Sequence, residues 1–137
     1  MRILLIILLS LTYLFSFDAL HVKAQIIAKI AHELVDKDIV NIYTDDESLI
    51  KTKGLVPSLN YTTKKNADIA FLTHKDTIEK TCKAKYIFST SYYNYKTSKK
   101  AIGAFFWQKG RPNIIIKSSM LKKLNIKLSQ SFQKYIE

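Results

Sequence analysis

The chain has 137 residues, of which 47% are hydrophobic and 24% are charged. This composition is typical of a folded globular protein and excludes a disordered chain. Twenty-two Lys and Arg residues outnumber eleven Asp and Glu residues, so the net charge is +11. A charge of this size predicts a partner that is anionic.

The N-terminus predicts an export signal. Met1 and Arg2 provide a short positive start, and residues 3–15 form an apolar run. A membrane-spanning helix needs about 20 apolar residues, so this run is short for a permanent anchor. Residues 1–16 therefore read as a cleaved signal peptide.

We expect cleavage after Ser16, with cleavage after Ala19 as the alternative. An uncleaved N-terminal anchor is a further alternative, and it also places the domain outside the cytoplasm. The remaining residues 17–137 match the usual size of one domain, so we expect a single periplasmic domain.

Export argues against nucleic acid as the anionic partner. Anionic lipid head groups in a peripheral membrane association, cell-wall polymers and an acidic protein surface remain as alternatives. A codon bias that favours lysine is another explanation of the charge. The single cysteine, Cys82, cannot form an internal disulfide, and we expect it to be buried rather than exposed or paired with a second chain. The sequence leaves the oligomeric state open, with a dimer among the alternatives.

The first half of the mature chain predicts a helix followed by a strand and a short helix. Apolar residues recur at helical spacing over residues 19–35, and residues 39–43 read as a short buried strand. Thr44 and Glu47 fit a capping box for a helix over residues 45–52. The same acidic run, residues 45–47, would alternatively bind a cation. A brief edge strand is expected at residues 59–61.

The second half alternates strands with short polar segments. We expect buried strands at residues 69–73 and 86–90, separated by a short helix at residues 76–82. Residues 91–100 lack a clear period and predict a loop.

Two apolar runs, residues 101–108 and 113–117, are joined by a Gly- and Pro-containing link that predicts a hairpin. Ser118 or Ser119 is expected to cap a helix reaching Leu124, and Ser129 to cap a last helix. Together these elements predict an α/β layered sandwich with a mixed sheet, a C-terminal β-hairpin and two short closing helices.

The sequence contains no catalytic motif. The three glycines are too far apart for a phosphate loop, and the three histidines lack metal-ligand spacing. No nucleophile, base and orienting group are recognisable together. We therefore expect no enzymatic activity, no cofactor and no metal.

Recognition residues are more plausible near the hairpin. Tyr92, Tyr93 and Tyr95 lie among lysines, and tyrosine is enriched at binding surfaces. Arg111 follows Trp107 closely and is the only arginine of the mature chain, and its planar fork can hold a carboxylate by two hydrogen bonds. These five residues are the candidate partner- or ligand-binding set. The alternatives are rings packed over the sheet and a solvent-exposed turn arginine.

The order of features resembles the YfiR-like (HmsC-like) family of periplasmic proteins. Residues 22–31 are similar to the lysine- and alanine-led first helix of that family, and residues 69–73 and 86–90 to its two core strands. The stretch from Ile102 to Tyr135 resembles its glycine-bearing strand, tight turn, second strand and closing helices. The chain lacks the Trp-Pro pair and the paired cysteines that the family often has.

This resemblance implies a function in regulation. Such a protein would bind the extracytoplasmic part of a membrane signalling protein, commonly a diguanylate cyclase, and hold it inactive. The alternative function is a periplasmic small-ligand-binding protein that is similar in architecture to one lobe of a solute receptor.

Overall fold

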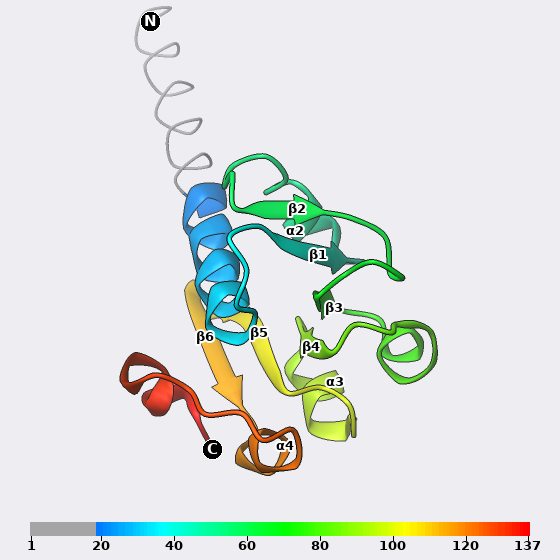
Figure 1. The fold of residues 1–137 in the computed structure, drawn as a ribbon, viewed down its shortest axis with the longest axis vertical. Coiled ribbons are helices and arrows are strands. Elements are labelled where there is room, and N and C mark those ends of the chain that lie inside the picture. Colours follow the sequence, from blue (N-terminus) through cyan, green and yellow to red (C-terminus); the bar gives the residue numbers. More distant parts are fainter. Residues whose placement is uncertain (1–18) are drawn as a thin grey trace, which may run out of the picture.

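The computed structural model describes residues 19–137, and the predicted signal peptide lies outside them. Six strands of this part form one sheet in the order β2-β1-β3-β4-β5-β6 (Figure 1). Neighbouring strands are parallel except β5 and β6, which form an antiparallel hairpin. The expected α/β fold with a mixed sheet is therefore confirmed. The strands are β1 (Val40–Thr44), β2 (Leu59–Tyr61), β3 (Ile69–Leu72), β4 (Tyr86–Ser89), β5 (Gly103–Gln108) and β6 (Arg111–Ile116).

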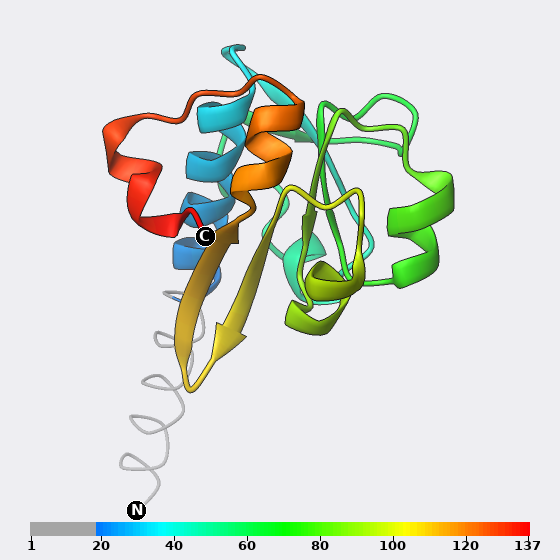
Figure 2. The same ribbon diagram turned by 90° about the horizontal axis from the view of Figure 1, so that it is seen from below.

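Helices cover both faces of the sheet. Residues 19–34 form the opening helix, which lies on one face beside the two closing helices (Figure 2). The opposite face carries a π-helical turn and a short α-helix (Figure 2). The remaining helices are α2 (Glu47–Ile50), the π-helix η1 (Thr77–Thr81), α3 (Tyr92–Thr97), α4 (Ser118–Lys123) and the 3₁₀-helix η2 (Gln130–Tyr135).

Strand β3 contributes side chains to two hydrophobic cores, one on each face of the sheet. All four of its residues are buried, and side chains alternate between the two faces of a strand. Ile69 and Phe71 join the large core under the opening helix, whereas Ala70 and Leu72 join a smaller core under η1. Cys82 belongs to this smaller core, so its expected burial is confirmed.

The loop predicted at residues 91–100 is wrong, because α3 occupies most of it. The helix starts where the Ser91 hydroxyl oxygen accepts a hydrogen bond from the Asn94 amide, at 3.3 Å. Packing of α3 against β4 and β5 then stabilises a segment without helical periodicity. The overlooked signal was the serine cap.

The capping box predicted for Thr44 and Glu47 is also wrong. The N-cap of α2 is Asp46, whose Oδ1 accepts hydrogen bonds from the Ser48 amide and hydroxyl at 2.9 and 2.7 Å. Thr44 instead accepts the amide of Asp46 at 3.1 Å. A carboxylate is a stronger acceptor than a hydroxyl, and it sits two residues closer to the helix.

Both closing helices exist, but the cap predicted for the first is wrong, and Ser129 takes the predicted N-cap position of the second without a side-chain capping bond. Lys117 occupies the N-cap position of α4, without a side-chain hydrogen bond. Ser129 does precede η2, but its hydroxyl contacts the Ser131 hydroxyl at 3.0 Å. Its amide donates to the Glu33 carboxylate of the opening helix, so a tertiary contact fixes this end.

The hairpin turn is shorter than the predicted four-residue link. Lys109 and Gly110 have φ angles of 52° and 70°, and two central residues with positive φ define the two-residue turn that suits a twisted hairpin. Arg111 is therefore not a turn residue: it begins β6 opposite Gln108.

Strand β6 is an edge of the sheet that the chain protects. The Ile116 carbonyl accepts the amide of Glu137 on the side away from β5. Because strand residues alternate in direction, Pro112 also presents its nitrogen outward, where the missing N–H costs no ladder bond. The edge is thus closed at one end by the C-terminal residues and lacks a donor at the other. No helix within residues 19–137 has the length and apolarity needed to cross a membrane.

Gly103 is predicted to be irreplaceable at the start of β5. A Cβ there would lie 2.5 Å from the Ile115 carbonyl oxygen and 2.8 Å from Cε1 of Phe88. Gly103→Ala should lower the free energy of unfolding by about 1–3 kcal/mol, because the crowded core must shift. Urea denaturation followed by circular dichroism measures this loss. Lys109→Asn in the same hairpin is the control, since Asn readily takes a positive φ. Equal losses in the two variants would contradict the steric explanation.

Candidate functional site

The carboxyl ends of five parallel strands meet at one edge of the sheet. This edge holds the residues that follow β1, β3 and β4, together with the last residues of β5. Ligands of open α/β sheets bind outside this edge, next to the point where the strand order reverses. In this chain the order reverses between β1 and β3.

The reversal point itself is closed by an internal contact. The Asp45 carboxylate accepts the backbone amides of Thr73 and His74 at 2.6 and 3.2 Å. The Asn94 side chain donates to the Thr73 carbonyl at 2.6 Å from α3. Asp45 therefore joins the loops after β1 and β3, and the alternative of a cation site at residues 45–47 gains no support from these hydrogen bonds.

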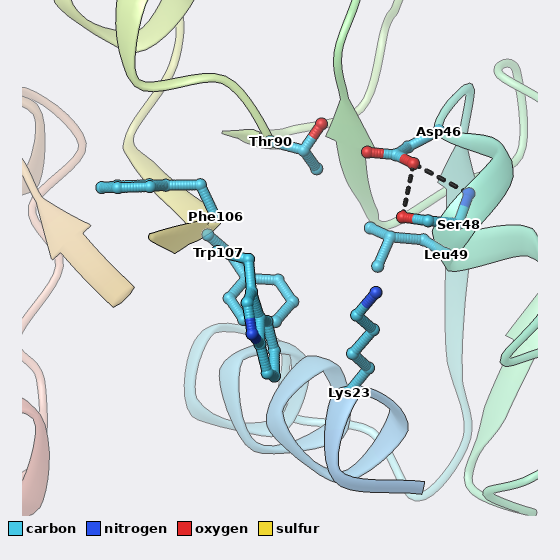
Figure 3. A pocket seen from close by; sticks show the side chains of 8 residues that line it. Lys23, Asp46, Ser48, Leu49, Thr90, Phe106 and Trp107 are labelled. Carbon is cyan, nitrogen blue, oxygen red and sulfur yellow. Dashed lines mark hydrogen bonds between the residues drawn. The ribbon is translucent and has the colours of Figure 1, made fainter. Parts of the chain in front are cut away.

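An open crevice lies beside this contact. Its walls are the opening helix, the start of α2, the residue after β4 and the end of β5, and its volume is about 270 Å³ (Figure 3). The side chains that line it include both charges and rings. They are Lys23, Asp46, Ser48, Leu49, Thr90, Phe105, Phe106 and Trp107.

Asp46 provides a fixed negative charge in the crevice. Burial raises the pKa of its carboxyl group, but Ser48, the nearby Thr90 hydroxyl and the Leu49 amide outweigh burial and bring the pKa below its ordinary value. The second carboxylate oxygen points toward Thr90, away from Ser48 (Figure 3). The Thr90 hydroxyl oxygen is buried and has no hydrogen-bond partner in the described part of the chain. The loops after β1 and β4 thus face each other with polar groups.

Lys23 and Trp107 form the opposite wall. The Lys23 ammonium lies 5.3 Å from the centre of the Trp107 ring, which is within the range of a cation–π contact. Phe105 supports the indole from beneath in an edge-to-face contact, with 6.4 Å between ring centres. The indole is 40% exposed, so it is held in place and still reaches solvent.

A second depression, the aromatic groove, lies on the other face of the hairpin. It has a volume of about 740 Å³ and shares Thr90, Phe106 and Trp107 with the crevice. Tyr92 of α3 packs against Phe106 with 5.5 Å between ring centres. The other residues of its lining are Ser91, Gln108, Asn113 and Ile115.

Four of the five predicted site residues are exposed, and Tyr92, Trp107 and Arg111 lie in or beside the two depressions. Tyr93 follows Tyr92 on α3 but lines neither depression. Tyr92 and Tyr93 on α3 are 45% and 70% exposed, and Trp107 lies between the crevice and the groove. Arg111 is exposed and stands opposite Gln108, which lines the groove. These residues form an accessible surface around the hairpin.

Tyr95 is the exception, because it is fully buried and cannot touch a partner directly. Its hydroxyl donates to the Glu137 carboxylate at 2.7 Å, and the Lys117 ammonium lies 4.7 Å from the centre of its ring. Burial, followed by the adjacent carboxylate, raises the pKa of Tyr95, so it stays a hydrogen-bond donor. Tyr95 thus fixes α3 to the C-terminal residues and supports Tyr92 from within.

Positive charge is concentrated in the part of the chain that builds the groove. Residues 80–136 contain thirteen Lys and Arg residues and no Asp or Glu, whereas residues 1–79 contain nine basic and ten acidic residues. The basic segment includes α3, the β5–β6 hairpin and both closing helices. The excess positive charge of the protein is therefore carried by the segment that contains β4, β5 and β6.

Sequence reasoning overlooked Lys23, Asp46 and Thr90 as neighbours. In the sequence Lys23 is one of several polar residues on an amphipathic helix, and Asp46 falls within the acidic run 45–47 at the start of a predicted helix. The rule that strand carboxyl ends share an edge could have grouped Asp46 with Thr90 once the strands were predicted. No group of three or more His, Cys, Asp and Glu side chains within residues 19–137 is placed to hold a metal ion.

The ionised state of Asp46 should make stability depend on pH. Because its folded-state pKa is depressed, the carboxylate stabilises the fold above the unfolded pKa of about 4, and this contribution is lost as pH falls through the folded pKa. Asp46→Asn keeps a cap oxygen but cannot ionise. Wild type should be the more stable at pH 7, with a difference that shrinks toward about pH 2 in urea unfolding. The exposed Asp36→Asn should change stability by less than about 0.5 kcal/mol at pH 7. A gap between wild type and Asp46→Asn that stays constant with pH would contradict this role.

The site therefore combines a small crevice of mixed charge with a wider aromatic groove inside a basic region. Such a surface can bind molecules by stacking, hydrogen bonding and charge, and both depressions lie where α/β sheets hold their ligands. No family model, no curated protein and no solved structure matches this chain.

Proposed function

We propose that this chain is a periplasmic regulatory protein that binds the extracytoplasmic part of a membrane signalling protein and represses it. The single observation that carries the proposal is the exposed aromatic surface of the groove, which Tyr92 and Trp107 line and beside which Tyr93 is exposed on the same helix as Tyr92. The resemblance of the sequence to the YfiR-like family adds the class of partner, a diguanylate cyclase. Export by the N-terminal segment supplies the compartment.

The composition of the groove supports a protein partner. Tyr, Trp, Phe and Arg are enriched at protein interfaces, and the groove region presents all four types. Large exposed rings beside a concave, partly apolar floor provide buried area with little loss of side-chain freedom. The volume of about 740 Å³ is sufficient to accept one or two protruding side chains of a partner.

Charge defines the chemistry of that partner. Around the groove Lys96 lies over the Tyr92 ring, at 5.6 Å from its centre, and Lys109 and Arg111 flank the hairpin end. Residues 91–117 contain no Asp or Glu. We therefore expect an apolar side chain of the partner to enter the groove within a ring of acidic residues, which also accelerates association.

Repression would follow from a population shift. A regulator that binds the inactive conformation of its partner more tightly than the active one moves the equilibrium toward the inactive state. The shift equals the difference between the two binding free energies, so a cue needs only to change that difference.

The docking surface can be tested with matched variants. The tagged full chain and each variant are used to purify partners from detergent-solubilised membranes, and captured proteins are identified by mass spectrometry. Tyr93→Ser and Arg111→Glu should each reduce capture of one membrane signalling protein about tenfold, because they remove an exposed ring and reverse a flanking charge. Higher salt should weaken the same complex.

The controls remove similar groups elsewhere. Ile39 is 58% exposed just before β1, and Lys65 is exposed in the connection between β2 and β3. Ile39→Ser and Lys65→Glu should therefore leave capture unchanged. The proposal fails if all four variants capture the membrane protein equally or if the chain binds only anionic lipid vesicles. Recovery of the unprocessed chain from the cytosolic fraction would also overturn it.

A further inference from the structure

Two opposite charges line the crevice without neutralising each other. Lys23 lies on the opening helix and Asp46 at the start of α2, and within residues 19–137 they form no ion pair with one another. Figure 3 shows both side chains directed into the same space, with the Trp107 ring beside them. Both side chains are half-buried, and each keeps capacity for a further partner beyond its contact with Ser48 or Trp107.

The polar groups of the crevice are arranged in two positions. On one side the second oxygen of Asp46, which does not bind Ser48, faces the buried Thr90 hydroxyl. On the other side the Lys23 ammonium lies over the indole. One position accepts hydrogen bonds and is anionic, whereas the other donates them and is cationic.

The volume limits the size of a ligand. At about 270 Å³ the crevice is just below the range of pockets that hold drug-sized molecules. Leu49, Phe105 and Trp107 provide an apolar wall between the two charges. A fitting molecule is therefore small, carries both charges and has a short apolar part.

We propose that the crevice binds a small zwitterion of the free amino acid class, with its ammonium group on Asp46 and its carboxylate on Lys23. The apolar part of the ligand lies against Trp107. An ammonium ion alone would leave Lys23 unsatisfied, and a carboxylate alone would be repelled by Asp46. This proposal names a ligand class for the alternative function predicted from the sequence, a small-ligand-binding protein. It does not depend on the docking of a protein partner.

Trp107 makes the test direct, because it is the only tryptophan of the chain. The full chain is titrated with each of the standard amino acids except tryptophan, and indole fluorescence is recorded. L-alanine, propionate and methylamine are compared as a matched series that carries both charges, the negative charge or the positive charge. We expect saturable changes with at least one amino acid, and L-alanine to bind at least tenfold more tightly than propionate or methylamine.

Variants assign the contacts to the two charges. Asp46→Asn and Lys23→Gln should each weaken binding of the best amino acid by about tenfold to a hundredfold, the usual cost of losing one charge-assisted contact. Lys29→Gln, on the exposed side of the same helix, and Asp36→Asn should bind like wild type. Circular dichroism verifies that each variant is folded, and isothermal titration calorimetry repeats the measurement without fluorescence. The proposal is overturned if no amino acid binds, if one charge suffices, or if both crevice variants bind normally.

Discussion

The hydrogen bonds from the Thr73 and His74 amides to Asp45 determine where the carboxyl edge of the sheet leaves space for a ligand. They join the loops after β1 and β3 at the reversal of strand order, the position where related architectures leave room for a ligand. A side-chain carboxylate takes the place that an external anion would occupy, and it satisfies backbone donors that burial would otherwise make costly. The open space is displaced by one strand, to the crevice between Asp46, Thr90 and the end of β5.

The strands of this protein could be predicted from its sequence, whereas the side chains that meet at the crevice could not. Apolar runs predicted the strands well, because burial on one or both faces leaves a pattern that a sequence displays directly. Residues 91–100 failed because α3 depends on one serine cap and on packing, neither of which changes periodicity. The tyrosines could be nominated as a group, yet only the structure separates exposed Tyr93 from buried Tyr95. Lys23 and Asp46 are far apart in sequence, and only the fold brings them together.

Tyr95 illustrates how a buried residue can shape a surface. Its hydroxyl bonds to Glu137, the Lys96 ammonium lies 3.8 Å from the same carboxylate oxygen, and the C-terminal backbone pairs with the edge of β6. Glu137 is therefore the one acidic side chain from residue 80 onward, and all other charged side chains of this segment are positive. Because this carboxylate is engaged by Tyr95 and Lys96, the basic charges around the groove keep their attraction for an outside partner.

The crevice and the aromatic groove are not separate in space, and this has a thermodynamic consequence. Thr90, Phe106 and Trp107 belong to both, with Phe106 directed to one face of β5 and Trp107 to the other. A zwitterion stacked on Trp107 and a partner seated against Phe106 would act on adjacent residues of one strand. If ligand and partner each prefer one position of the indole, the ligand alters the affinity of the partner, and the partner alters the affinity of the ligand by the same factor. Under both proposals, two modest binding events at one strand end would be sufficient to make the protein responsive to a small molecule, without a domain that closes.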